Sequence, residues 1–260
     1  MNVKYDFTDK VALIVGGADG MGKATAYLMA ESGAKVLVAD YSEEKGKNVV
    51  ADLKEKGYTA EFVLTDIRNK DSVFAMVDKA VELWGRIDYA ANVAGVFGRA
   101  DGLPFYKKAD DDYENVINTN LRGHWWLLQA ETEQMVKQGG EGYSIVEVSS
   151  VQGLIGSPSG PQYTAAKHAI VGLVKSLGAE FAKQGIRING IAPVETATDL
   201  IKGFYTQMAG SFSKETKRVP RGTMLEPEEC AHAIVWLLSD GASSMNCTTI
   251  AVDGGATSTK

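Results

Sequence analysis

The sequence has few of the residues that build metal centres and disulfide frameworks. It contains two cysteines, Cys230 and Cys247, and three histidines, His124, His168 and His232. The cysteines do not have the spacing of metal ligands, and no two histidines are spaced as a ligand pair. We therefore expect no metal site, thiols that are buried or part-buried, and histidines with structural or surface roles.

Long apolar runs and excess positive charge are also missing. No apolar run reaches the roughly 18 residues that indicate a membrane-spanning helix, and the N-terminal segment has no apolar signal core. The 27 lysines and arginines are outnumbered by 33 aspartates and glutamates, which gives a net charge of −6. Because an acidic chain is not attracted to polyanions, we expect no nucleic-acid partner and no membrane partner. These features together predict a cytoplasmic protein.

The composition favours one folded domain of the α/β class. Of the 260 residues, 45% are hydrophobic, which is enough to bury a sizeable core. Short apolar runs alternate with longer segments of helical apolar spacing, and no repeat or low-complexity linker interrupts them. This alternation is typical of a parallel sheet covered by helices. We therefore expect a single domain over residues 1–260.

A glycine cluster near the N-terminus has the pattern of a loop that binds a dinucleotide. It occupies residues 15–22, directly after an apolar run and directly before a segment with helical spacing. Glycine permits the positive φ of a tight turn, and a helix N-terminus offers free N–H groups to a phosphate. A structural turn that binds nothing is the alternative. The expected cofactor contacts in this loop are Gly16, Asp19, Gly20, Met21 and Gly22.

The second predicted strand ends in a carboxylate that bears on the choice of cofactor. This residue, Asp40, lies about 20 residues beyond the glycines, where an acid binds the ribose hydroxyls of a dinucleotide. A carboxylate there repels a 2′-phosphate. The next residue is Tyr41 rather than an arginine, and the nearby Lys23 and Lys45 do not occupy the obvious contact position. Asp40 and Tyr41 are therefore expected beside the adenosine, and the sequence favours NAD(H) over NADP(H).

Tyr163 and Lys167 are candidate proton-transfer residues. They are four residues apart, so they share one face of the helix predicted over residues 164–183. The pKa of a free tyrosine is about 10, and a neighbouring ammonium or an oxidised nicotinamide ring lowers it. Tyr163 can then act as a general base towards an alcohol, and Ser150 can hydrogen-bond the same substrate oxygen.

Position separates Tyr163 from a second tyrosine with the same spacing. Tyr41 and Lys45 are also four residues apart, so the spacing alone is weak evidence. Ser150, however, directly follows an apolar strand predicted over residues 144–149, and a loop rich in glycine, serine and proline connects it to the Tyr163 helix. This layout puts Ser150 at a carboxyl end of the sheet, where open α/β folds bind their ligands.

These motifs resemble those of the short-chain dehydrogenase/reductase family, of the compact NAD-dependent type, from about Asp9 to Gly255. Three family motifs are present with one change each, in which Val15 replaces a threonine, Val93 an asparagine and Val194 a glycine. The catalytic positions of the family fall on Asn120, Ser150, Tyr163 and Lys167. The resemblance implies a three-layer, doubly wound parallel sheet (a Rossmann fold) of about seven strands with helices on both faces.

The resemblance also implies a role for each catalytic residue. Tyr163 would exchange a proton with the substrate, Lys167 would lower the tyrosine pKa and bind the nicotinamide ribose, and Ser150 would orient the substrate oxygen. Asn120 would hold a water that links Lys167 to solvent, while hydride passes directly between nicotinamide and substrate carbon. The further cofactor contacts that it implies are Asp66, Ile67, Asn92, Ala94, Gly95, Pro193, Thr196 and Thr198, with Tyr163 and Lys167.

The substrate is expected to meet a lid over about residues 196–218. Large apolar residues at 204, 205, 208 and 212 have helical spacing, so part of the lid is expected to be an amphipathic helix. This lid favours a bulky cyclic alcohol such as a hydroxysteroid or a bile acid, whereas Gln152, Gln162 and Glu195 favour a polyol or a sugar. The lid can equally pack on its own core or on a neighbouring subunit. The residues expected around the substrate are Ser150, Gln152, Tyr163, Val194, Phe204 and Tyr205, with Phe97 and Leu154 in the same cleft.

Two other enzyme classes and one binding module are alternatives. A 3-oxoacyl-carrier-protein reductase shares the fold and the four catalytic residues, but it typically prefers NADPH, and Asp19 and Asp40 weigh against that cofactor. An enoyl reductase of the related type needs a wider spacing than that of Tyr163 and Lys167. A non-catalytic dinucleotide sensor has no reason to keep the four catalytic residues together.

The resemblance also implies an oligomeric state. Members of the family are commonly tetramers built on paired long helices, which in this chain would be residues 120–137 and 163–183. The first of these segments carries Trp125, Trp126 and Leu127, which suit an interface or a buried core equally well. We therefore expect a homotetramer that acts on a small-molecule substrate.

Overall fold

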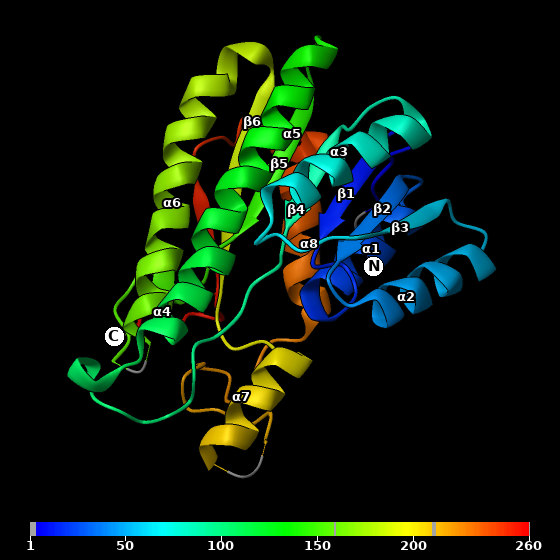
Figure 1. Cartoon of the computed structure of the whole chain (residues 1–260). Coiled ribbons are helices and arrows are strands. Elements are labelled where there is room, and N and C mark those ends of the chain that lie inside the picture. The colour runs from blue at the N-terminus through cyan, green and yellow to red at the C-terminus, as the bar shows by residue number, and fades with distance from the viewer. Residues whose placement is uncertain (1–3, 159, 210–211, 260) are drawn as a thin grey trace.

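Seven parallel strands form one sheet at the centre of the computed structural model, which describes residues 4–158, 160–209 and 212–259 (Figure 1). The strand order is β3-β2-β1-β4-β5-β6-β7. Strands β1, β4 and β5 are buried along their whole length, which is the pattern of a parallel sheet with both faces covered. The predicted doubly wound parallel sheet is confirmed. The strands are β1 (Val11–Val15), β2 (Lys35–Asp40), β3 (Ala60–Leu64), β4 (Tyr89–Asn92), β5 (Tyr143–Val148), β6 (Ile186–Pro193) and β7 (Thr249–Val252).

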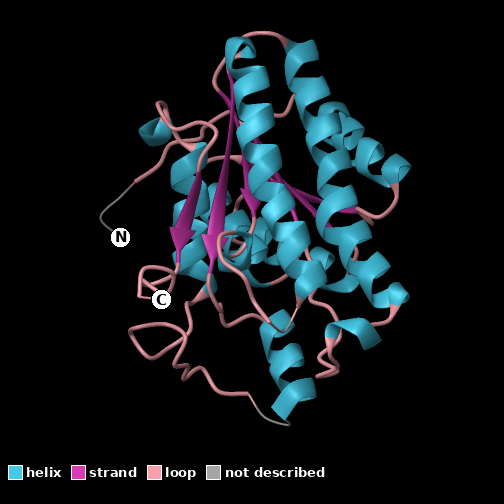
Figure 2. Ribbon diagram, turned by 90° about the vertical axis from the view of Figure 1, so that its left-hand side faces the viewer, coloured by secondary structure: helices cyan, strands magenta, loops and turns pink. Residues whose placement is uncertain are grey.

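Helices cover both faces of the sheet and so create two hydrophobic cores (Figure 2). Apolar residues of α1, α2 and α8 pack on one face, and those of α3, α5 and α6 pack on the other. Among the described residues, no helix has the length and apolar character needed to cross a membrane. The helices are α1 (Gly20–Glu31), α2 (Glu43–Glu55), α3 (Lys70–Trp84), α4 (Asp110–Ile117), α5 (His124–Gln138), α6 (Pro161–Phe181), α7 (Asp199–Ala209) and α8 (Pro227–Leu238).

The strand order reverses between β1 and β4, and this reversal creates a crevice. The chain runs from β1 outwards to β2 and β3, and then returns to place β4 on the other side of β1. Val15 pairs with Asn92 in the parallel register, so the loops that follow the two strands leave the sheet side by side. Ligands of open α/β sheets bind in the crevice at such a point.

Two predicted helices have different boundaries in the structure. α6 begins at Pro161 rather than at residue 164, because proline suits the first helical turn, where its missing N–H would have no helical partner. Tyr163 therefore lies inside the first turn of the helix. The helix predicted over residues 120–137 begins as α5 only at His124, and Asn118–Gly123 form a π-helical turn before it.

The predicted lid contains α7, which projects beyond the carboxyl end of the sheet (Figure 1). The helix ends at Ala209, so the prediction that Phe212 belongs to it is wrong. Phe212 instead packs against a small third core in which Ile201 and Met224 are buried. Tyr205 of α7 packs on the same small core, so helix and loop residues both contribute to it.

Candidate active site

Tyr163 and Ser150 meet at the carboxyl end of β5. Ser150 follows the strand and is the N-cap residue of the single turn Val151–Gly153, whereas Tyr163 lies in the first turn of α6. Their side chains are close enough for Ser150 to act on the ionisation of Tyr163. Burial raises the pKa of Tyr163 to about 12, and the Ser150 side chain acts in the opposite direction. Tyr163 therefore needs a nearby positive charge to act as a base near neutral pH.

Lys167 supplies a positive charge next to Tyr163. Its ammonium lies 5.6 Å from the centroid of the Tyr163 ring and donates a hydrogen bond to the carbonyl of Val148 at 2.7 Å. Burial of this side chain lowers the pKa of Lys167 to about 8, and the charge of Glu147 opposes that fall. Lys167 is therefore charged at neutral pH but close to its titration range.

Asn120 reaches the site from the π-helical turn between α4 and α5. Its side-chain Oδ1 accepts from the N–H of Val96 at 2.8 Å, and its Nδ2 donates to the carbonyl of Val96 at 2.7 Å. Turns of this kind are often found at functional sites. Because the amide is paired with both backbone groups of Val96, it fixes the chain after β4, while its second N–H and second lone pair remain for other partners.

A cavity of about 450 Å³ runs along the glycine loop and the ends of β1, β2 and β4. Asp40 is fixed at its wall, since one carboxylate oxygen accepts from the N–H of Ala18 at 3.1 Å and the other from the N–H of Ser42 at 2.9 Å. This geometry fixes the Asp40 carboxylate at the cavity wall, where it can accept further hydrogen bonds. The predicted cofactor contacts that line the cavity are Gly16, Asp19, Gly20, Met21, Asp40, Tyr41, Asp66, Ile67, Ala94, Gly95 and Thr198.

Two glycines of the loop are required by close packing. Gly20 has a φ of +51°, and a Cβ there would lie 2.7 Å from Cγ2 of Thr198. A Cβ on Gly22 would lie 2.0 Å from the carbonyl oxygen of Gly16. The absence of side chains lets the loop pack closely on α1 and Thr198, and it leaves the start of α1, where free N–H groups and the helix dipole favour an anion, at the cavity wall. The loop therefore fits the pyrophosphate of a dinucleotide.

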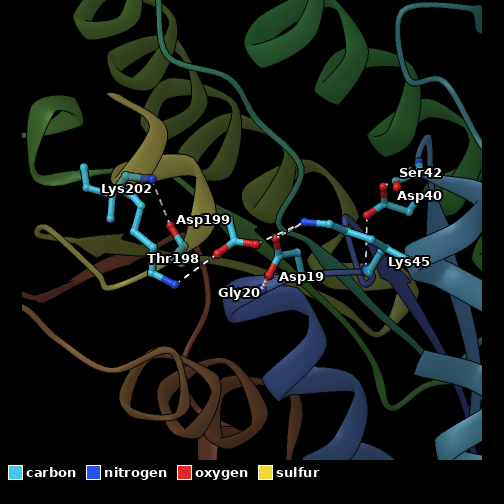
Figure 3. Close-up of polar contacts among 10 residues, drawn as sticks. Asp19, Gly20, Asp40, Ser42, Lys45, Thr198, Asp199 and Lys202 are labelled. Atoms are coloured by element: carbon cyan, nitrogen blue, oxygen red, sulfur yellow. Dashed lines mark hydrogen bonds and ion pairs between the residues drawn. The ribbon is translucent and has the colours of Figure 1, made fainter. Parts of the chain in front are cut away.

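Lys45 joins the glycine loop to the lid helix (Figure 3). Its ammonium lies 2.8 Å from a carboxylate oxygen of Asp19 and 3.1 Å from one of Asp199, at the start of α7. Asp19 also caps α1 by accepting from the N–H of Gly20 at 2.7 Å, and Asp199 pairs with Lys202 at 3.0 Å. The two carboxylates raise the pKa of Lys45. Exposed pairs of this kind stabilise the fold little, but these neutralise the charge of Lys45.

A second cavity, of about 390 Å³, adjoins the first and contains Tyr163. The ring of Phe97 contacts both Tyr163 and Phe204, with centroid distances of 4.9 Å and 5.2 Å. Leu154, which was expected in this cleft, is not among its lining residues, and its neighbour Ile155 lines the cavity instead. The predicted cofactor and substrate contacts found here are Met21, Gly95, Ser150, Gln152, Tyr163, Lys167, Pro193, Val194, Thr196, Thr198, Phe204 and Tyr205.

The two glutamines of the second cavity are already hydrogen-bonded within the protein. Gln162 is buried, and its Nε2 donates to a carboxylate oxygen of Asp112 at 2.7 Å. The Oε1 of Gln152 accepts from the hydroxyl of Thr164 at 3.1 Å. These contacts reduce the capacity of both side chains to bind the hydroxyls of a polar substrate.

Glu195 is also paired with other side chains of the protein. Its carboxylate accepts hydrogen bonds from the hydroxyl of Tyr205 and, at 2.7 Å, from that of Thr216. Arg218 pairs with it at 3.0 Å. Burial and the Glu195 carboxylate raise the pKa of Tyr205 to about 12, so Tyr205 stays a neutral donor to that carboxylate. The polar side chains around Glu195 at this cavity therefore bind one another through hydrogen bonds and an ion pair.

Three predicted site residues line neither cavity. Gly22 and Asn120 lie behind the lining, where they hold the glycine loop and the chain after β4. The side chain of Asn92 turns into the interior, where its amide donates to Glu131 at 3.0 Å and to Glu147 at 2.8 Å. The structure therefore does not bring Asn92 to the cofactor cleft.

The structure also adds lining residues that sequence reasoning missed. Lys45, Thr119 and Asp199 line the first cavity, and Ile155 and Arg218 line the second. Asp199 had a local signal, because it is an acid in the first turn of a predicted helix. Lys45 was expected near the cofactor but off the contact position, and Arg218 was the end of the predicted lid. Thr119 and Ile155 had no local signal.

Comparisons with known proteins find matches along nearly the whole chain. Residues 16–257 match the family model described as Enoyl-(Acyl carrier protein) reductase. The chain is 37% identical over 256 residues to Short chain dehydrogenase/reductase astE of Aspergillus oryzae, covering 97% of this chain and 96% of that protein. It is 35% identical over 269 residues to 3beta-hydroxysteroid dehydrogenase of Mediterraneibacter gnavus, covering 96% of each. The solved structure of Levodione Reductase superimposes with a TM-score of 0.89 at 32% identity, covering 98% of this chain and 100% of that chain.

Proposed function

The chain belongs to the short-chain dehydrogenase/reductase family, and from this premise we propose that it is an NAD(H)-dependent enzyme that interconverts a secondary alcohol and a ketone. The supporting observation is that Tyr163, Ser150 and the Lys167 ammonium line the second cavity, next to the first cavity, which is walled by the Asp40 carboxylate. When bound, the nicotinamide dinucleotide supplies the hydride donor or acceptor.

Three side chains account for the proton transfer in this proposal. The Tyr163 oxygen takes the proton of an alcohol, or gives a proton to the oxygen of a ketone. The Ser150 hydroxyl hydrogen-bonds the same substrate oxygen and stabilises the negative charge that develops there. The Lys167 ammonium stabilises the phenolate, and each unit by which it lowers the tyrosine pKa is worth about 1.4 kcal/mol. Without this charge, the buried tyrosine would remain protonated.

The residues of the first cavity support NAD(H) rather than NADP(H). The start of α1 would hold the pyrophosphate, and the Asp40 carboxylate would accept hydrogen bonds from the adenosine ribose. Two cationic side chains line this cavity within the part of the chain that the structure describes. Both are paired, Lys45 with Asp19 and Arg68 with Asp66 at 2.7 Å. A 2′-phosphate would therefore meet a carboxylate and no unpaired cation.

For the substrate, we propose a bulky cyclic secondary alcohol such as a hydroxysteroid. The second cavity, of about 390 Å³, is within the size range of small-molecule sites, about 300–1,000 Å³. Phe97, Ile155, Val194 and Phe204 give it apolar walls. A polyol would bring many hydroxyls to a site whose Gln152, Gln162 and Glu195 are already paired, and polar groups left unpaired oppose binding. The similarity to a 3beta-hydroxysteroid dehydrogenase supports the same class.

Charge pairing at the second cavity further favours a neutral ring. Arg218 pairs with Glu195 at 3.0 Å, and Arg99, which also lines the cavity, pairs with Asp111 at 2.6 Å. A carboxylate or phosphate on the substrate would have to compete with these acids. This argues for uncharged hydroxysteroids over bile acids, and against an acyl-carrier substrate of the kind named in the description of the matched family model.

The test is NAD⁺ reduction by the purified protein across hydroxysteroids, bile acids, simple cyclic alcohols and polyols. We expect the highest kcat/KM with an uncharged hydroxysteroid. The Phe204→Ala variant is expected to lower kcat/KM for that substrate about tenfold, mainly through KM, because it removes about 1–3 kcal/mol of apolar contact. A simple cyclic alcohol that is too small to reach Phe204 should change little with the same variant.

Each result of the panel bears on a different part of the proposal. A higher kcat/KM with polyols would contradict the substrate class but not the chemistry. Activity confined to a carrier-linked ketone with NADPH would support a 3-oxoacyl-carrier-protein reductase. Silence across the panel with NADH still bound would contradict the enzymatic proposal and favour a dinucleotide sensor.

We also propose that the enzyme is a homotetramer built on α5 and α6, which lie on the same face of the sheet. α5 exposes Trp125 by 50%, and the chain before it exposes the rings of Phe105 and Tyr106. Large apolar rings in water favour burial in a subunit contact. Light scattering at micromolar concentration is expected to give four times the 27.9 kDa of one chain. A monomer mass would overturn the proposal.

A further inference from the structure

His124 and Glu147 form a fully buried pair beneath the candidate active site. Both side chains are 0% exposed, with His124 at the start of α5 and Glu147 in β5. Nδ1 of His124 lies 2.5 Å from Oε2 of Glu147, and its Nε2 lies 2.9 Å from the carbonyl oxygen of Ala94. Ala94 lines the cofactor cavity, so the pair reaches from the interior to the wall of the cleft. No step of the proposed chemistry uses it.

The two contacts of His124 determine how many protons the pair holds. A carbonyl oxygen and a carboxylate oxygen only accept hydrogen bonds, whereas a neutral imidazole has one N–H and one lone pair. A neutral ring beside an ionised Glu147 would therefore direct a lone pair at an oxygen in one of the two contacts. Both contacts are satisfied if the ring is an imidazolium with an N–H on each nitrogen, or if Glu147 itself carries the extra proton.

The surroundings of Glu147 favour the first of these forms. Its Oε1 accepts from the amide of Asn92 at 2.8 Å, and the Lys167 ammonium acts on it electrostatically. A donor and a nearby positive charge both stabilise a carboxylate. An imidazolium beside a carboxylate satisfies both contacts of the ring and has zero net charge, which limits the cost of burying the pair.

The side-chain amide of Asn92 also contacts a second buried carboxyl group, whose surroundings favour a different charge state. Asn92 also donates to Glu131 on α5, at 3.0 Å. Burial raises the pKa of Glu131 well above its ordinary range, the Asn92 hydrogen bond opposes this rise, and the charge of Glu147 adds to it. These effects favour the neutral form of Glu131. Glu147 therefore acts electrostatically on two buried groups, Glu131 on α5 and Lys167 on α6.

We propose that Glu147, kept ionised by His124 and Asn92, is a positioning residue that supports the charge of the Lys167 ammonium. The proposal rests on the proposed function, because the charge of Lys167 matters to turnover only if Tyr163 transfers a proton.

The backbone around Lys167 supports this role. Lys167 donates to the carbonyl of Val148, the residue after Glu147. Its Nζ also lies 3.6 Å from the position that a Cβ would take on Gly95, the residue after Ala94. His124 and Glu147 therefore hold the two chain segments that contact the ammonium.

The direction of the expected effect follows from the charge of Glu147. Burial lowers the pKa of Lys167 to about 8, and the Glu147 carboxylate opposes this fall. Without the carboxylate, Lys167 loses its proton at a lower pH, and the Tyr163 phenolate then loses its support. The alkaline limb of the kcat/KM profile for alcohol oxidation should therefore move to lower pH.

The first test compares two neutral replacements of similar shape. Glu147→Gln is expected to move the alkaline limb down by about half to one pH unit. Glu131→Gln also replaces a carboxyl group that contacts the Asn92 amide, but it removes no charge. The alkaline limb of the kcat/KM profile of this variant should therefore coincide with that of the wild type. An unmoved profile in a folded, NADH-binding Glu147→Gln enzyme, or an equal shift in both variants, would overturn the proposal.

The second test needs no substrate, so it separates this proposal from the proposed function. The chain has three histidines, and the ring signals of His124 in ¹⁵N-histidine-labelled protein are identified by their loss in His124→Gln. NMR is expected to show protons on both ring nitrogens of His124 at neutral pH in the wild type. Glu147→Gln should leave one proton on the ring. A singly protonated ring in the wild type would overturn the proposal whether or not a substrate is found.

Discussion

Replacing Tyr163 with phenylalanine is expected to remove nearly all turnover while leaving NADH binding close to that of the wild type. The change deletes the hydroxyl that carries the proton, and positioned acid–base groups contribute about 10²- to 10⁴-fold to rate. The ring itself remains packed against Phe97, 4.9 Å between centroids, so the shape of the cavity should persist. Steady-state kcat/KM in both directions and NADH fluorescence titration measure the two effects.

A tyrosine elsewhere provides the control for this variant. Tyr113 lies on α4 and is largely exposed, away from the lining of both cavities. Tyr113→Phe makes the same chemical change and should leave kcat/KM within about twofold, as surface substitutions usually do. If Tyr163→Phe kept a tenth or more of the wild-type turnover, the acid–base role would have to move to another residue.

The sequence predicted the parts of the site that follow from local pattern. Tyr163 and Lys167 are one helical turn apart, and Ser150 follows an apolar strand, so their order along the chain places all three at one end of the sheet. Asp40 was predictable for the same reason, because it ends the strand after the glycine loop. In each case the residue lies at the end of an element whose apolar periodicity is strong.

The parts that could not be predicted depend on contacts between distant segments. Lys45 meets Asp199 across 154 positions of sequence, and no local pattern encodes that approach. Whether Leu154 or Ile155 lines the cavity depends on the path of an irregular loop, which no local pattern predicts. His124 had no pattern of its own, since a single histidine in a helix is most often structural, and its pairing with Glu147 needs the sheet to be assembled.

The second large effect is expected in the choice of dinucleotide. Two unit charges at 4 Å repel by about 1 kcal/mol in water and by about 4 kcal/mol near a protein surface. Since about 1.4 kcal/mol corresponds to tenfold, the fixed Asp40 carboxylate should favour NAD⁺ over NADP⁺ by about 5- to 10³-fold in kcat/KM. Asp40→Asn removes the charge and is expected to raise kcat/KM with NADP⁺ at least about fivefold. Equal efficiency of the wild type with both cofactors would contradict the assignment.

Lys45 allows a sharper form of the same test, because its charge is present but neutralised. Adding Asp199→Asn to Asp40→Asn removes one of its two acids and leaves Asp19 as its partner, 2.8 Å away. The lysine can then attract a 2′-phosphate, so the double variant should use NADP⁺ better than Asp40→Asn alone. Lys45→Gln in the double variant should cancel this second gain and retain the first. If the gain survived without Lys45, the loss of negative charge around the ribose, rather than a freed cation, would be its cause.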